Sequence, residues 1–321
     1  SALVLATDAE SVLRTMSAVY FTPVITEAGL TQAVQEARAD ERLRAIVSPD
    51  EELRDALFAA LFPSGPNHFS PVDVSGVAAL HLEDARSFAT RAFRASNATL
   101  VLTGDVDSAL LDAAVPGRGE HEAPEALTAA AHPVTASSNP VTQSGSIPGF
   151  GYAWAGPAIK DEHAATALDF VADYLFNPDS GIVTQQTGDL DVTINAQYVT
   201  YYDPGVFYVE AIGTQAAGVR TKVDEALAAM RKPLDAKIFE SARRQFEYHV
   251  TSDVSTPLSL ADNFGWYASE GNAAYAPGAD LMGGRYISSV RALTPKLVAE
   301  TVQKYLSAPP ATVTLEPKPS K

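Results

Sequence analysis

The six histidines are the side chains of this sequence best suited to bind a metal or to move a proton. They stand at positions 68, 81, 121, 132, 163 and 249. Two histidines four residues apart on one helix can hold a metal together, because that spacing puts both imidazoles on one face. No pair here has that spacing. His163 follows Asp161 and Glu162 at an expected helix start, and we interpret it as an exposed side chain.

Other chemistries are excluded by residue type, spacing or charge. Cysteine is absent, which excludes disulfides, cysteine-bound zinc and thiol nucleophiles. No serine stands in a Gly-x-Ser-x-Gly motif, and the glycines near 149–151 and 283–284 lack the spacing of a phosphate-binding loop. Lys and Arg total 23 and Asp and Glu total 39, so the formal charge is 23 − 39 = −16. This charge excludes the broad basic surface of a nucleic-acid binder and favours basic partners.

No apolar run is long enough to span a bilayer. We therefore expect a soluble chain with no direct membrane span. The sequence does not indicate a cellular compartment, because the absence of cysteine fits reducing and oxidising locations alike. Since residue 1 is Ser and no signal pattern precedes the first element, we expect that the chain was trimmed, processed or expressed as a piece.

The first 115 residues contain mostly helix-type patterns. A run of apolar residues at 2–6 predicts a buried strand, and residues 97–102 predict a second strand that ends at Gly104. The helices are placed by apolar periodicity and by capping residues such as Ser48, which precedes Pro49. Residues 63–76 are rich in Pro and Gly and predict a loop. The expected helices begin after Thr7-Asp8-Ala9-Glu10, cover about 27–44, follow Ser48, and cover about 82–94.

The rest of the chain begins with a linker. Residues 115–148 are rich in Pro, Ala, Ser and Thr without an apolar period, and predict a linker plus an entry strand. Strands and amphipathic helices then alternate up to the C-terminus. The expected strands cover about 149–155, 190–200, 205–213 and 311–316, and the expected helices cover about 162–175, 216–231, 234–251, 257–269 and 295–306.

The two halves end in similar sequences. Residues 77–80 match 290–293 and residues 98–102 match 311–315, both at an offset of 213 and without a gap. Two unrelated helix–strand units that match by chance are the alternative. If the repeat is real, the first-copy counterpart of the strand at Gly149 falls at 149 − 213 = −64. The first unit would then lack its opening strand and helix, so something else must complete it, or upstream residues are missing.

The motifs along both halves occur in a recognisable order. They are residues 80–85 with Phe88, 97–107, 202–207, 284–286 through 293–295, and 312–317. In this order and spacing the chain resembles the M16 family, the pitrilysin/insulinase group that includes mitochondrial processing peptidase and the bc1-complex core subunits. The resemblance implies an α+β fold of two tandem homologous domains, each a mixed or antiparallel sheet covered by helices. We expect an incomplete first domain at 1–115, a linker and entry strand at 116–148, and a second domain at 149–321.

Active members of that family carry His-x-x-Glu-His on the first helix of domain 1, with a distal Glu as third zinc ligand. This sequence has no such motif. By the resemblance, Glu36 stands at the distal ligand position, although sequence chemistry alone makes it a solvated helix glutamate. It cannot hold zinc alone, so zinc would come from a partner or from a missing N-terminal segment. In the family, an Arg and a Tyr of domain 2 help to hold the substrate near the metal. By the resemblance, residues 180–191 form the corresponding segment. They contain no Arg and no Tyr, and Asp191 stands at the position of the Tyr.

Three functions remain open. The first is a non-catalytic subunit of a heteromeric zinc peptidase, which would pair with a homologous subunit carrying His-x-x-Glu-His and would act on peptides. The second is a structural scaffold like the bc1 core subunits. The third is the C-terminal portion of an active zinc endopeptidase. In each case the chain as given would be inactive on its own, and at most part of a metalloendopeptidase.

Overall fold

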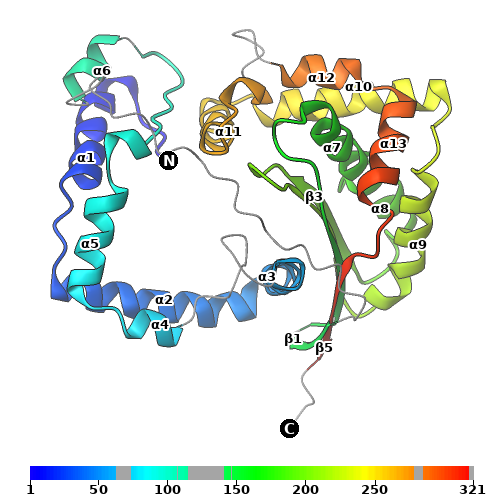
Figure 1. Ribbon diagram of the computed structural model, residues 1–321, viewed down its shortest axis with the longest axis horizontal. Helices are drawn as coiled ribbons and strands as arrows, with labels where there is room; N and C mark the ends of the chain where they lie inside the picture. The colour runs from blue at the N-terminus through cyan, green and yellow to red at the C-terminus, as the bar shows by residue number, and fades with distance from the viewer. Residues whose placement is uncertain (63–73, 107, 115–140, 146, 278–284, 318–321) are drawn as a thin grey trace.

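The computed structural model of the chain describes residues 1–62, 74–106, 108–114, 141–145, 147–277 and 285–317. Every strand in these ranges belongs to one five-stranded sheet of order β1-β5-β2-β4-β3 (Figure 1). β1 pairs with β5 in parallel, and the other neighbours are antiparallel, so the sheet is mixed. The strands are β1 (Val141–Gly145), β2 (Gly149–Ala155), β3 (Thr193–Val199), β4 (Val206–Ile212) and β5 (Ala311–Pro317).

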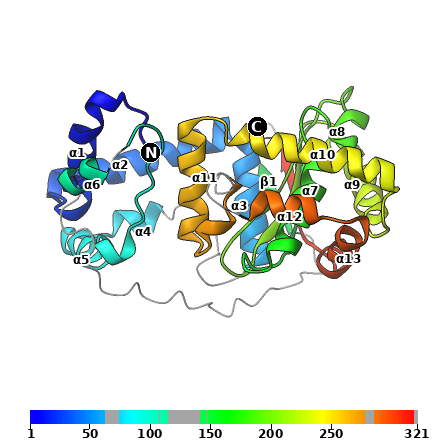
Figure 2. The same ribbon diagram turned by 90° about the horizontal axis from the view of Figure 1, so that it is seen from above.

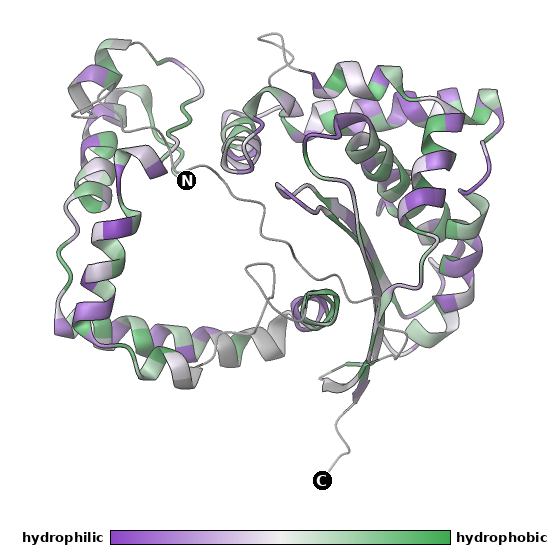
Figure 3. Ribbon diagram, viewed as in Figure 1, coloured by the Kyte–Doolittle hydropathy of each residue, from purple (hydrophilic) through white to green (hydrophobic). Residues whose placement is uncertain are grey.

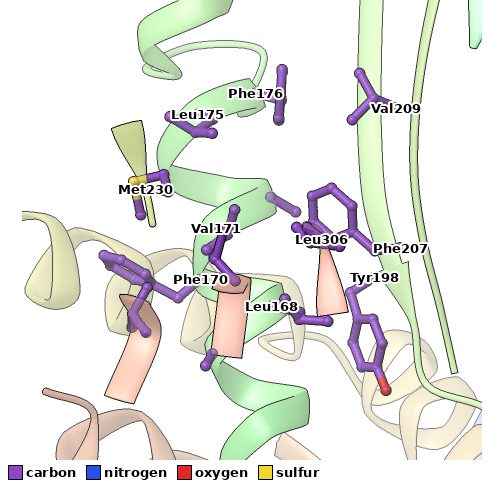
Figure 4. Packing of buried hydrophobic residues seen from close by; sticks show 14 of the residues in the cluster. Leu168, Phe170, Val171, Leu175, Phe176, Tyr198, Phe207, Val209, Met230 and Leu306 are labelled. Carbon is purple, nitrogen blue, oxygen red and sulfur yellow. The ribbon is translucent and has the colours of Figure 1, made fainter. Parts of the chain in front are cut away.

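One face of the sheet is covered by a layer of helices. α7 is the central helix of this layer, and its Leu168, Phe170 and Val171 are fully buried between the strands and the other helices (Figure 4). Asp161 caps α7, because its carboxylate accepts from the backbone N–H of Ala164. The helices on this side are α7 (Glu162–Phe176), α8 (Ile182–Gln186), α9 (Ala216–Ala229), α10 (Ala236–Asp253), α12 (Tyr286–Ala292) and α13 (Pro295–Tyr305).

The opposite face of the sheet is covered by a helix from the first half of the chain. α3 (Pro49–Leu61) buries Leu53, Leu57 and Leu61 against β2, β4 and β5. α2 (Glu27–Val47) leads from the remaining N-terminal helices to α3 (Figure 1). All seven residues of β4 are buried, since helices cover both of its faces. The sheet of the second half therefore depends on a helix of the first half for its core.

The contact between α3 and β2 depends on a glycine. A Cβ atom on Gly151 would lie 2.5 Å from Cδ1 of Leu57, which is fully buried. We expect Gly151→Ala to lower the free energy of unfolding by about 1–3 kcal/mol, because the extra methyl overpacks this contact. Urea unfolding of both variants would test this, with Gly218→Ala on α9 as the control, since no atom lies within 4 Å of that Cβ. A Gly151→Ala protein as stable as the control would contradict the prediction.

The first 114 residues fold differently from the sequence-based expectation. The strands expected over 2–6 and 97–102 are wrong, because these stretches contain only irregular backbone and two short 3-10 helices, Ala6–Asp8 and Ala95–Asn97. A strand is stable only when it hydrogen-bonds to a neighbour, and the described residues place none beside them. Leu3, Leu5 and Leu100 are accordingly 73%, 71% and 47% exposed. The helices here are α1 (Ala9–Phe21), α2, α3, α4 (Val74–Ala78), α5 (Leu82–Ala92) and α6 (Ser108–Ala114).

Two other expectations are only partly covered by the described residues. Of the loop expected over 63–76, residues 63–73 lie outside them, and residues 74–78 form α4. Of the linker and entry strand, residues 115–140 lie outside them, and β1 follows. Within the described ranges, no helix is both long enough and apolar enough to cross a membrane.

Candidate functional site

A groove of about 740 Å³ runs beside the outer edge of β3. β3 is the last strand in the sheet order, so its outer edge pairs with no described strand. Seven consecutive residues, 195–201, line the groove. Its walls come from α3, from α7, from the C-terminal end of α10 and from α11 (Pro257–Ser269). The site is therefore a groove that follows an open strand edge.

The walls of the groove carry an excess of negative charge. Its five carboxylates are Glu51, Asp55, Asp169, Asp173 and Asp253. Arg54 is the cation among the lining residues, and its Nη2 lies 2.8 Å from Oε1 of Glu210 and 3.3 Å from Oδ2 of Asp50. The charge of Arg54 is thus matched by neighbouring carboxylates. An incoming ligand meets a predominantly acidic surface, which favours a cationic ligand.

The pair of Arg54 and Glu210 joins α3 to the middle of the sheet. Glu210 is only 1% exposed, and its Oε1 also accepts from Nδ2 of Asn195 at 2.9 Å. Burial raises the pKa of Glu210, while the hydrogen bond and the charge of Arg54 act to lower it. The guanidinium of Arg54 also lies 5.3 Å from the centre of the Tyr208 ring. These contacts fix the α3 wall of the groove relative to β3 and β4.

Asp169 is the lining carboxylate whose pKa is moved into the neutral range. Burial raises its pKa to about 7. The hydroxyl of Tyr286 donates to Oδ2 of Asp169 at 2.7 Å, and this hydrogen bond acts to lower the pKa. Tyr267 also lies close, and its pKa is raised by burial. The structure thus places a carboxyl that can give or take a proton near pH 7 at the wall of the groove.

A second polar contact joins α7 to α10. Nδ1 of His249 lies 2.7 Å from Oδ1 of Asp173, and Nδ2 of Asn177 donates to the same oxygen at 2.9 Å. Asp169 and Asp173 are four residues apart and lie on one face of α7. Two aspartates four residues apart on one helix face are visible in the sequence and could have indicated this part of the site. Neither residue was among the predicted site residues. The pairing with His249 has no such signal, because it joins residues 76 positions apart.

The structure places the sequence-predicted metal ligand outside the groove. Glu36 is exposed on α2 and accepts from Nε2 of Gln32 at 2.8 Å. Across the part of the chain that the structure describes, no three His, Cys, Asp or Glu side chains are grouped so that they could hold a metal ion. His163 is exposed at the start of α7, as predicted, and positions 68, 121 and 132 lie outside the described residues. The described side chains therefore do not fit a zinc ion.

The family model described as the peptidase M16 inactive domain matches residues 79–246, just over half of the sequence. The chain belongs to the peptidase M16 family. No curated protein matches the chain by sequence. The M16 assignment confirms the family named from the sequence motifs, and it accounts for a mixed sheet with helices on it.

Solved structures agree with the M16 fold. A protease from Helicobacter pylori superposes with a TM-score of 0.79 at 18% identity, over 97% of this chain and 77% of that one. An M16 inactive domain from Pseudomonas fluorescens gives 0.76 at 17% identity, over 98% and 77%. Complex III from Candida albicans gives 0.70 at 12% identity, over 97% and 78%. At these identities the likenesses establish the fold alone.

The segment where the resemblance places the Arg/Tyr pair of the M16 family has another use here. Asp191, at the position of the Tyr, accepts from Oγ1 of Thr214 at 2.5 Å, and its backbone N–H donates to Oε1 of Gln215 at 2.7 Å. These bonds hold the turn after β4 against the segment before β3. Asp191 therefore has a local structural role in this M16 chain.

Proposed function

We propose that this M16 protein is a non-catalytic subunit that holds an extended, basic peptide along the open edge of β3. The single observation that carries the proposal is the groove of about 740 Å³ along residues 195–201. An extended peptide can add to an open edge as a further strand, because the edge offers a row of unpaired N–H and C=O groups. The groove side chains then select among peptides.

The charge of the groove supports a Lys- or Arg-bearing peptide. Five carboxylates line it, and Arg54 is already paired with Glu210. Asp173 approaches from α7, and Glu51 and Asp55 from α3, so a bound strand would have acidic groups on both sides. Complementary charge speeds association and excludes wrong partners more than it adds affinity. We therefore expect selectivity for basic peptides that weakens as salt rises.

Cleavage of the bound peptide is assigned in this proposal to a homologous subunit that carries His-x-x-Glu-His. A catalytic zinc needs three protein ligands and an open position. The described residues supply no such group, and Glu36 is a single exposed carboxylate bonded to Gln32. A mixture of this chain and such a partner should cleave a basic peptide that neither cleaves alone. Cleavage by this chain alone, after dialysis against a chelator, would contradict the proposal.

Peptide binding can be tested without a partner. We expect a labelled seven-residue peptide, the length of β3, to bind when Lys alternates with apolar residues, and to lose binding when Glu replaces Lys. The double variant Glu51→Gln with Asp253→Asn should weaken binding of the Lys peptide by about three- to tenfold, since it removes two charges from the groove. Fluorescence anisotropy at low and high salt measures both effects.

The matched control for this experiment is Glu225→Gln, an exposed carboxylate of α9 away from the groove. It changes the net charge without changing the groove, so binding should stay as in the unaltered chain. Equal binding of the Lys and Glu peptides, or equal weakening by the control, would show that the groove does not select basic peptides.

Two other functions have an observation in their favour. The likeness to complex III of Candida albicans favours a structural scaffold. The exposed apolar side chains of the first helices favour the C-terminal portion of an active zinc endopeptidase. Stoichiometric co-purification with respiratory membrane subunits would support the scaffold. A His-x-x-Glu-His motif upstream in the same reading frame, with one zinc per chain, would support the endopeptidase.

A further inference from the structure

The backbone groups of β4 alternate between its two neighbouring strands. The N–H of Gly156 donates to the carbonyl oxygen of Gly205 at 2.7 Å, and the N–H of Gly213 donates to that of Pro148 at 2.9 Å. These two bonds continue the antiparallel ladder of β2 and β4 beyond both of its ends. Since hydrogen-bonded pairs alternate along such a ladder, odd-numbered residues of β4 direct their N–H and C=O groups at β2, and even-numbered residues direct theirs at β3.

The same alternation identifies the backbone groups at the outer edge of β3. Even-numbered residues of β4 stand opposite odd-numbered residues of β3, as Glu210 does opposite Asn195. The odd-numbered residues of β3 therefore bond to β4, and the even-numbered residues direct their N–H and C=O groups away from it. No described strand pairs with these outward groups. They belong to Ile194, Ala196 and Tyr198.

α11 covers the same row of backbone groups beyond the C-terminal end of β3. Nε1 of Trp266 donates to the carbonyl oxygen of Thr200 at 3.1 Å, and the carboxylate of Glu270, which follows α11 directly, accepts from the N–H of Tyr202. Thr200 and Tyr202 continue the even-numbered row. In both views, α11 lies between the sheet and α5 (Figures 1 and 2). This helix therefore takes up the hydrogen-bonding groups that a longer bound strand would need.

The N-terminal end of the edge is closed as well. The N–H of Val192, the even-numbered residue just before β3, donates to the carbonyl oxygen of Leu190 at 2.9 Å. The open edge is therefore limited to residues 194–198, with α11 at one end and a local backbone bond at the other. A strand that adds here gains backbone hydrogen bonds over this window alone, whatever its full length.

The face of the window towards α7 is apolar. Ile194 and Tyr198 belong to the buried cluster beneath α7, and Ala196 packs against it. Figure 3 shows α7 as a largely apolar helix, and Phe176 and Phe246 line the groove on this side. The lining carboxylates of α7 are already hydrogen-bonded within the fold. Peptide side chains on this face should therefore be apolar.

The face of the window towards α3 is polar and acidic. Nδ2 of Asn195 donates to the buried Glu210, and Gln197 is exposed on the same face, since residues two apart in a strand share a face. Glu51 and Asp55 of α3 line the groove, four residues apart on one side of that helix. A cationic side chain on this face meets these two carboxylates.

We propose that the groove recognises a five-residue peptide segment of the pattern apolar–basic–apolar–basic–apolar, held opposite residues 194–198. Its two basic side chains lie opposite Asn195 and Gln197 and point towards α3, because directly opposite residues of neighbouring strands share a face. α11 sets the end of the segment through Trp266. This inference rests on the proposed function and adds the length and register of the peptide.

Amide exchange followed by NMR tests the register directly. The probe is an end-blocked peptide, Val-Lys-Val-Lys-Val, at saturating concentration. The exchange of the Ala196 and Tyr198 amides should slow by at least about tenfold, because the peptide covers them. The Val192 and Tyr202 amides should exchange as in the free protein, since bonds within the fold already hold them. Equal slowing at Tyr202 and Tyr198 would overturn the proposal.

The two tryptophans report whether α11 stays on the edge. The indole N–H of Trp266 should keep its exchange rate in the complex, because its bond to Thr200 lies outside the window. The indole N–H of Trp154, which donates to the carbonyl oxygen of Ala308 at 2.9 Å, is the internal reference. Faster exchange at Trp266 alone would show that the peptide displaces α11, and would overturn the proposal.

Peptide length provides a second measurement, by fluorescence anisotropy. Adding one serine to each end of the probe should change the affinity by less than about threefold, because the added residues find no open edge groups. Removing both terminal valines should weaken binding by about tenfold or more, because edge hydrogen bonds are lost. Affinity that rises steadily from three to seven residues would overturn the closed window.

Single variants test the face on which the lysines lie. Glu51→Gln should weaken binding of the probe by about three- to fivefold, and Asp253→Asn, at the end of α10, by less than about twofold. The opposite order would overturn the register while leaving a basic-peptide groove in place. If no Lys peptide binds at all, the proposed function fails and this inference fails with it.

Discussion

Arg54→Leu is expected to lower the free energy of unfolding by about 3–5 kcal/mol at pH 8, because it leaves a buried carboxylate without its counter-charge. Glu210 is 1% exposed, its Oε1 keeps only the amide of Asn195, and its Oε2 has no hydrogen-bond partner among the described residues. The loss should be seen in urea unfolding followed by tryptophan fluorescence. α3 should then separate from the sheet more easily, and the groove should lose its α3 wall.

The pH dependence of the stability of Arg54→Leu separates the effect of the lost charge from the effect of the changed packing. Without Arg54 the pKa of Glu210 should rise further, because the hydrogen bond and charge that lower it are gone. The loss of stability should therefore shrink as the pH falls towards 5 and Glu210 takes up a proton. Adding Glu210→Leu to Arg54→Leu should recover most of the loss.

The control is Arg14→Ala, which removes an exposed ion pair with Glu10 on α1. This substitution should lower the free energy of unfolding by less than about 1 kcal/mol. A loss for Arg54→Leu that is equally small, or one that is the same at pH 5 and pH 8, would contradict the prediction.

Asp169→Asn is expected to stabilise the fold by about 2–4 kcal/mol at pH 8 and to have little effect near pH 4. Burial raises the pKa of Asp169 from 3.8 to about 7, so the folded protein binds this proton more tightly than the unfolded chain. The unaltered protein therefore loses stability as the pH rises from about 4 to 7, where the folded carboxyl ionises. An asparagine can still accept from the Tyr286 hydroxyl, yet it never ionises.

Chemical unfolding of both proteins at several pH values between 4 and 8 measures this difference. Tyr286→Phe provides the opposite test, because it removes the hydroxyl that donates to the ionised carboxylate at 2.7 Å. In that variant the loss of stability on raising the pH should be larger than in the unaltered protein. A stability difference between Asp169→Asn and the unaltered protein that does not change with pH would contradict the assignment.

Local patterns of the sequence determined most of the second half. The strand over 149–155 and the helix over 257–269 form with the predicted bounds, because alternation, apolar periodicity and capping residues act over a few neighbouring residues. The order and spacing of the motifs were also sufficient to indicate the M16 family, which the match over residues 79–246 confirms. Absent residue types, such as cysteine, excluded whole classes of chemistry.

The tertiary structure alone decided three features: which strands form, where the groove lies, and which charges are paired. Residues 2–6 and 97–102 have strand-type sequences but form no strand, because a strand takes its hydrogen bonds from a neighbour and not from itself. Glu210 pairs with Arg54 across 156 positions and Asp173 with His249 across 76. Such contacts depend on how helices and sheet pack together, and no local spacing in the sequence encodes that packing.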